Sequence, residues 1–218
     1  MKNIKTILLG TMIIVLTSGF SMHSSADLSA NVAVTSEYYY RGILQNDSSA
    51  SAGIDYESDG FFLGTWAADV DDGLEVDFYT GYGIKTESGL TLGIGFTGYY
   101  YTGEFDDTYE EVNLVAGFGP INIEYSIGEY ANFDGPTQDY DFIAITFEYQ
   151  DFYTTYGSFG DDFDGEYLEL GYGTQIGSFD ISIAGIFSSD ELSDELNSDG
   201  NPTESEALVI TLSKSFDL

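Results

Sequence analysis

The sequence LEVDFYTGYGIKTESGLTLGIGFTGYYY at residues 74–101 alternates apolar and polar side chains on both sides of a short turn. In its first half, Leu74 and Phe78 share one face of an extended chain and Glu75 lies on the other. A period of two is typical of a β-strand with one apolar face. The turn at 86–89 contains Gly, so the stretch predicts a β-hairpin.

The same alternation recurs in twelve segments, at 28–38, 49–57, 61–69, 74–85, 90–101, 109–118, 121–130, 138–149, 152–159, 166–175, 179–187 and 207–218. Short connections at 58–60, 86–89, 119–120, 150–151 and 176–178 alternate with generally longer ones at 39–48, 70–73, 102–108, 131–137, 160–165 and 188–206. Outer-membrane barrels alternate short and long turns in this way. The pattern predicts an all-β, antiparallel transmembrane β-barrel of about twelve strands, within a range of ten to fourteen.

The N-terminus has the features of a secretory signal peptide. Lys2 and Lys5 precede the apolar run ILLGTMIIVL at 7–16, and small residues at 24–26 form a cleavage site. A retained membrane helix is the alternative, but the apolar run is short for a span. We therefore expect a signal peptide at 1–26 and one barrel domain at 27–218. An even strand count would place both termini in the periplasm of a Gram-negative bacterium.

The charge balance is strongly acidic, with 38 Asp and Glu against 5 Lys and Arg. After signal removal, the bases are Arg41, Lys85 and Lys214. Such a chain repels phosphates and attracts cations, which excludes nucleic acid as a partner. Without Cys there is no disulfide and no lipid anchor on a cysteine, and no cofactor is indicated. The expected partners are outer-membrane lipid and lipopolysaccharide, the outer-membrane insertion machinery and small solutes.

A soluble β-sandwich would show similar alternation. Aromatic clusters near predicted strand ends, at 38–40, 61–62 and 99–101, instead favour the interfacial girdles of a membrane barrel. The last segment keeps its alternation to the chain end at Leu218, as a closing strand does.

Two stretches carry a family resemblance, ANVAVTSEYYYRGILQND at 30–47 and GFFLGTWAADVDDGLEVDFYTGYG at 60–83. Their most specific parts are Tyr40-Arg41-Gly42-Ile43 and the Gly-x-Trp-Ala of 64–67. With the run of hairpins that follows, the chain resembles the TorF-type family of porin-like outer-membrane barrels. The resemblance implies the fold and the location, and no particular solute. Many outer-membrane proteins end in Phe or Trp, whereas this chain has Phe216 two residues before its end.

If the apolar faces meet lipid, the opposite faces meet the lumen. A ring of carboxylates in a confined bore concentrates cations, so we predict a channel for passive diffusion of small solutes that prefers cations. The alternative is that tyrosine hydroxyls and the two bases pair these carboxylates into a plug. The predicted pore-lining residues are Arg41, Asp55, Glu57, Glu75, Asp77, Lys85, Glu111, Glu124, Glu148, Glu169 and Asp180.

Arg41 has two interpretations: a constriction residue that faces an acidic wall, or a rim residue paired with Glu37, Asp47 or lipid. Trp66 is expected to pack or to join a girdle rather than bind a ligand. The acidic connections, such as 188–206, lack EF-hand spacing and predict no metal site. They could instead contact partners in a structural or adhesive barrel that does not conduct.

An enzyme is not expected. The sole histidine, His23, leaves with the signal peptide, so the usual general base is missing. Glu75 and Asp77 share one face and could form a carboxylate pair, but nothing in the sequence separates their pKa values.

Overall fold

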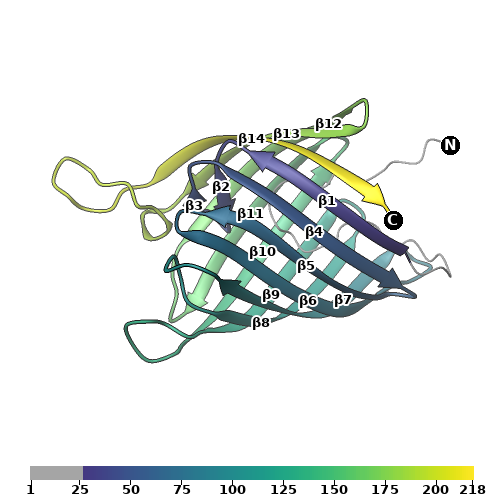
Figure 1. The fold of residues 1–218 in the computed structure, drawn as a ribbon, viewed down its shortest axis with the longest axis horizontal. Helices are drawn as coiled ribbons and strands as arrows, with labels where there is room; N and C mark the ends of the chain where they lie inside the picture. The colour runs from purple at the N-terminus through teal and green to yellow at the C-terminus, as the bar shows by residue number, and fades with distance from the viewer. Residues whose placement is uncertain (1–26) are drawn as a thin grey trace.

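The computed structural model describes residues 27–218, so the signal peptide predicted at 1–26 lies outside the described residues. Twelve antiparallel strands close into a barrel, which confirms the predicted fold (Figure 1). The barrel strands are β1 (Asp27–Thr35), β4 (Ser49–Ser58), β5 (Phe61–Val70), β6 (Gly73–Lys85), β7 (Leu90–Tyr101), β8 (Tyr109–Phe118), β9 (Ile121–Tyr130), β10 (Gln138–Tyr149), β11 (Phe152–Asp161), β12 (Glu166–Ile176), β13 (Phe179–Ser188) and β14 (Ser205–Asp217). Neighbouring strands follow chain order, and β1 closes the circle by pairing with both β4 and β14.

The apolar side chains of the strands cover the outside of this barrel. Phe78, Ile94 and Ile127 are 55, 53 and 55% exposed, whereas the alternate residue Asp77 is buried. The soluble sandwich is therefore wrong, because these faces lie outward and do not pack against a second sheet. On β5, whose facing is ambiguous in the sequence, Phe62 lies inward and is 5% exposed.

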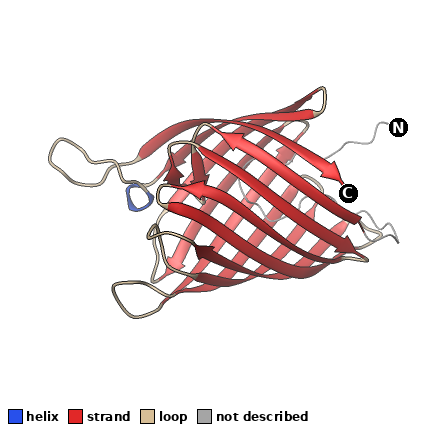
Figure 2. Ribbon diagram, in the orientation of Figure 1, coloured by secondary structure: helices blue, strands red, loops and turns tan. Residues whose placement is uncertain are grey.

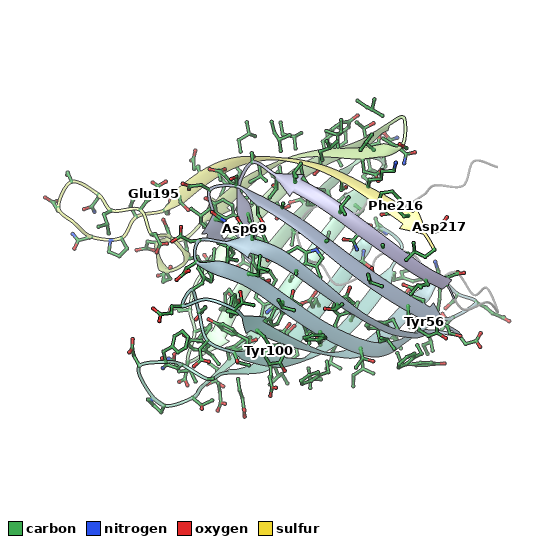
Figure 3. All side chains as sticks on the ribbon, viewed as in Figure 1. Tyr56, Asp69, Tyr100, Glu195, Phe216 and Asp217 are labelled. Atoms are coloured by element: carbon green, nitrogen blue, oxygen red, sulfur yellow. The ribbon has the colours of Figure 1, made fainter. Side chains whose placement is uncertain are left out.

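The two ends of the barrel differ. Asp27 and Leu218 lie at the end with the short turns, where the Leu218 N–H donates to the carbonyl oxygen of Leu28 at 2.9 Å. At this end the turn after β4 places Asp59 and Gly60 at positive φ (52° and 85°), the backbone of a tight hairpin turn. Figure 3 shows Asp69 and Glu195 toward the opposite end, where the long connections gather.

The longest connection follows β13 and contains a short 3₁₀ turn, η1 (Asp190–Leu192), drawn blue in Figure 2. Among residues 27–218, no helix is long and apolar enough to cross a membrane.

Two predicted connections are wrong. The connection predicted at 70–73, among the longer ones, is only two residues long, because β5 ends at Val70 and β6 begins at Gly73. The first strand ends at Thr35, three residues earlier than expected, and residues 39–48 are not a simple loop. Instead β2 (Tyr38–Tyr40) and β3 (Ile43–Asn46) form a separate two-stranded sheet, which lies within the circle of barrel strands (Figure 1). Tyr38 and Tyr39 are only 5 and 9% exposed, so they do not belong to an interfacial girdle. We call the segment 38–46 the inner hairpin.

Tyrosines on the inner wall lie across glycines of the neighbouring strand. The register pairs Tyr153 with Gly171, and a Cβ added at Gly171 would overlap the Tyr153 ring. Tyr79 crosses Gly64 in the same manner. Two further pairs, Tyr140 with Gly128 and Tyr167 with Gly157, repeat the arrangement. Because glycine has no side chain, the tyrosine ring can lie flat over it and cover the inner surface of the wall at that position.

The pairing predicts that Gly171→Ala destabilises the folded barrel by about 1–3 kcal/mol, because the new methyl group displaces the Tyr153 ring. The measurement is urea unfolding of the refolded mature protein, followed by Trp66 fluorescence. Gly185→Ala is the matched control, since its Cβ would meet only the Phe187 ring at 3.5 Å. Equal losses in both variants would contradict this account.

Candidate functional site

The inner hairpin carries Arg41 into the lumen. Arg41 and Gly42 form its turn, both at positive φ (48° and 83°). A Cβ on Gly42 would lie 2.7 Å from the Tyr167 Cβ, so the position requires glycine. The Ser188 hydroxyl donates to the Gly42 carbonyl oxygen at 2.6 Å and ties the turn to β13. Arg41 is only 6% exposed. Arg41 therefore lies inside the barrel and is not a rim residue, whereas its role as a constriction stays a prediction.

The Arg41 guanidinium is bound by two carboxylates on adjacent strands. Nη1 and Nη2 donate to the two oxygens of Glu111 on β8, at 2.8 and 2.9 Å. Nη2 also donates to Glu124 on β9 at 2.9 Å and to the Ser126 hydroxyl at 3.1 Å. The guanidinium carbon lies 4.1 Å from the centre of the Phe142 ring. A bidentate pair with a ring stacked against it fixes both position and orientation.

Neutral donors complete the coordination of Glu111. The hydroxyls of Tyr99 and Tyr140 donate to it at 2.7 and 3.0 Å, and the Asn113 amide donates at 2.7 Å. Elsewhere on the wall the same chemistry recurs, because Tyr79 donates to Asp55 and Tyr153 to Glu169. Tyrosine hydroxyls therefore supply many of the hydrogen-bond donors to carboxylates that Lys or Arg would supply in a less acidic lumen.

The strand pattern places the ten predicted wall residues other than Arg41 on the inward-facing parity of their strands. Glu75, Asp77, Glu111 and Glu169 are fully or almost fully buried. Asp55, Glu57, Glu124 and Asp180 are partly buried, and Lys85 and Glu148 are exposed at the end with the short turns. Arg41 brings Glu111 and Glu124 together, whereas Lys85 contacts neither of them. That these residues line a conducting pore stays a prediction.

Sequence reasoning missed the polar residues that complete the network, notably Asn113 and Ser126, which are both fully buried. Asn113 donates to the Ser126 hydroxyl at 2.9 Å and accepts from Thr97 at 2.9 Å. The alternation along each strand could have identified them, because each of these small polar residues occupies an inward-facing position. Trp66 packs inside, with its ring 5.7 Å from that of Tyr38.

Glu75 and Asp77 form a separate buried pair on β6, and both are 0% exposed. Tyr38 donates to Glu75 Oε1 at 2.9 Å. Glu75 Oε2 and both Asp77 oxygens have no hydrogen-bond partner among residues 27–218. Buried carboxylate oxygens without donors cost stability. Within these residues, no group of three or more Asp, Glu, His or Cys is arranged to hold a metal ion.

The chain belongs to the family described as "Bacterial protein of unknown function (Gcw_chp)", which matches residues 20–204. The TorF-type family expected from the sequence motifs is not confirmed. No curated protein matches the chain.

Among solved structures, the chain is similar to three outer-membrane proteins of Pseudomonas aeruginosa. OprD shares 13% identity at a TM-score of 0.43, over 91% of this chain and 66% of that one. OccD3 (OpdP) shares 14% at 0.42, over 91% and 66%. OpdK shares 13% at 0.39, over 79% and 58%, so this chain spans less than two thirds of its length. At this level of similarity, function has to be inferred from the residues of this chain.

The buried pair on β6 predicts that Asp77→Asn stabilises the barrel by about 1–3 kcal/mol, because it replaces a buried carboxyl group whose two oxygens have no hydrogen-bond partner among residues 27–218. Urea unfolding measures the change. Asp180→Asn is the control, since Asp180 accepts a hydrogen bond from Gln175 at 3.1 Å and is not expected to gain. A loss of stability in Asp77→Asn would refute the interpretation.

The ion-paired turn predicts that Arg41→Ala destabilises the protein by about 3–5 kcal/mol, because Glu111 is left buried without its counter-charge. Lys214→Ala removes a base that forms no ion pair within residues 27–218 and contacts the exposed rings of Phe179 and Phe216, so stability should change by about 1 kcal/mol or less. Unfolding midpoints for the two variants provide the comparison. Similar midpoints would mean that the inner hairpin is held by its apolar contacts alone.

Proposed function

We propose that this protein is a porin-like channel in the outer membrane of a Gram-negative bacterium, through which small solutes diffuse and cations pass preferentially. In this proposal the signal peptide at 1–26 is removed, the insertion machinery assembles the barrel, and the short turns face the periplasm. The long acidic connections then lie outside, next to lipopolysaccharide. An enzyme is not proposed, because residues 27–218 contain no His or Cys to serve as base or nucleophile.

The apolar exterior supports a membrane location. Large apolar side chains on every barrel strand are exposed, among them Leu63, Phe96 and Leu212. In water such a continuous surface would drive association, whereas in lipid it is the expected outer band of a barrel. Tyr100 on β7, which packs edge-on against Phe78 at 6.0 Å, lies on this outer face in Figure 3.

The charge of the inner wall carries the proposed selectivity. Nine of the eleven predicted wall residues are carboxylates, and of the two bases only Arg41 is buried among them. Arg41 contacts both Glu111 and Glu124, so even at its own site negative charge is in excess. A polar passage with this excess attracts cations and repels anions.

The inner hairpin favours a second candidate, a barrel that does not conduct and acts through its acidic connections. Tyr38 packs with Ala68 and Val70 on β5, and Tyr39 packs with Ile186 and Val209 on β13 and β14. The inner hairpin therefore contacts walls on both of its sides. In a twelve-strand barrel, which lies between filled and open sizes, such a segment can narrow the lumen or seal it.

The first test is the reversal potential of refolded mature protein in a planar bilayer under a KCl gradient. We expect conductance with cation preference, and a smaller preference in Glu57→Gln/Glu148→Gln, which removes two inner-face charges near the short turns. Glu195→Gln, in the long connection after β13, is the control for removing a carboxylate far from that mouth.

The outcomes separate the two candidates. Anion preference would refute the acidic-lumen channel. A folded, heat-modifiable barrel that shows no conductance would favour the sealed alternative. If the inner hairpin closes the lumen, Arg41→Ala should then produce a measurable conductance. A silent Arg41→Ala barrel would place the function in the acidic connections.

A further inference from the structure

A cavity of about 270 Å³ lies on the side of the inner hairpin that faces the long connections. Tyr40, Arg41 and Leu44 of the inner hairpin form part of its lining. Phe105, in the connection after β7, and Phe163, in the connection after β11, also line it. We call this space the vestibule.

Aromatic rings dominate the vestibule, since eight of its fourteen lining residues are Tyr or Phe. Several rings hold one another in place. Phe163 stacks on Tyr140 with ring centres 5.1 Å apart, and Phe105 lies 5.6 Å from Tyr101. Tyr109 meets Tyr140 edge-on at 6.1 Å. The rings come from different strands and connections, so they surround the space instead of forming one flat patch.

The vestibule is also negatively charged. Asp106 lines it and accepts hydrogen bonds from the hydroxyls of Tyr109 and Tyr130, at 2.8 and 2.7 Å. These neutral donors orient the carboxylate without cancelling its charge. Asp194 also lines the vestibule. The base in the lining is Arg41, whose charge is more than offset by Glu111 and Glu124.

No other base of residues 27–218 lies near enough to neutralise the vestibule. Lys85 ends β6 beside the short turn at 86–89. Lys214 contacts the ring of Phe179, the first residue of β13, at 5.2 Å. Both lysines therefore lie toward the end with the short turns, and the vestibule attracts cations.

We propose that the vestibule binds a small organic ammonium ion. The faces of aromatic rings attract a desolvated cation, and aromatic cages recognise quaternary ammonium groups by this interaction. A metal ion would need several converging ligands, and among residues 27–218 no three Asp, Glu, His or Cys side chains are grouped to supply them. An anion would meet Asp106 and Asp194. The site goes beyond the proposed function, because it binds its ligand whether or not the lumen conducts.

The test is isothermal titration calorimetry of the refolded mature protein in detergent, with choline and with its neutral isostere 3,3-dimethylbutan-1-ol. Choline should bind at least about tenfold more tightly, because the two probes have the same shape and differ in charge. Equal affinity would overturn the proposal and leave an apolar cavity without charge recognition. Absence of binding heat for choline at several temperatures would also overturn it.

Two variants examine the parts of the site separately. Phe163→Leu keeps apolar bulk but removes a π face, and Asp106→Asn keeps shape but removes charge. Each should weaken choline binding about five- to tenfold. Phe133→Leu and Asp134→Asn, in the connection after β9, are the matched controls, because neither residue lines the vestibule.

The controls should bind choline as the parent protein does. Unchanged affinity in both vestibule variants, or equal weakening in the controls, would refute the assignment. Heat-modifiability on gels verifies that each barrel is folded. Should Asp106→Asn fail to fold, Phe163→Leu alone decides, and because the assay needs no conductance its outcome is independent of the channel test.

Discussion

The contact between Arg41 and Glu111 is the interaction on which the interior of this barrel depends. It joins the tip of the inner hairpin to β8 through two hydrogen bonds at 2.8 and 2.9 Å, and Glu124 extends the contact to β9. A buried ion pair gains little against solvated charges, but losing one partner is costly. The pair therefore favours one position of the inner hairpin. An apolar segment without such a pair could adopt many positions inside a barrel of this size.

The rest of the interior follows from having a single base among many acids. Several carboxylates that Arg41 cannot reach, among them Asp55 and Glu169, accept a hydrogen bond from tyrosine, whose hydroxyl donates without adding charge. Tyr79 reaches Asp55 and Tyr153 reaches Glu169 because each ring crosses a glycine on the next strand. Each such hydrogen bond therefore depends on a tyrosine and on the glycine that its ring crosses. The composition of the chain, with 26 Gly and 18 Tyr, fits a wall built by repeating it.

The barrel could be predicted from sequence because its signal is local. Alternation in residues such as 74–85 indicates the strand and which of its faces points outward. The lengths of most connections indicate the end of the barrel at which they lie, and the two-residue connection 71–72 is the exception. The inner hairpin could not be predicted in this way. Tyr38, Tyr39 and Tyr40 form an aromatic run that resembles a girdle, and the partners of Arg41 are 70 and 83 residues away in the chain. Nothing in one sequence indicates which of many acids a distant arginine will meet.

The same network bears on how an acidic lumen could pass cations without trapping them. A bare carboxylate in a narrow bore would hold a cation tightly, and conduction requires that binding be weak enough for exit. Here Glu111 already accepts hydrogen bonds from Arg41, Tyr99, Tyr140 and Asn113, so its charge is spread over several donors. In the proposed channel, Glu111 would therefore attract a passing cation less strongly than an unpaired carboxylate would. Glu75 and Asp77 differ from Glu111, because three of their four carboxylate oxygens have no hydrogen-bond partner among residues 27–218 and both side chains are fully buried, away from any passing ion.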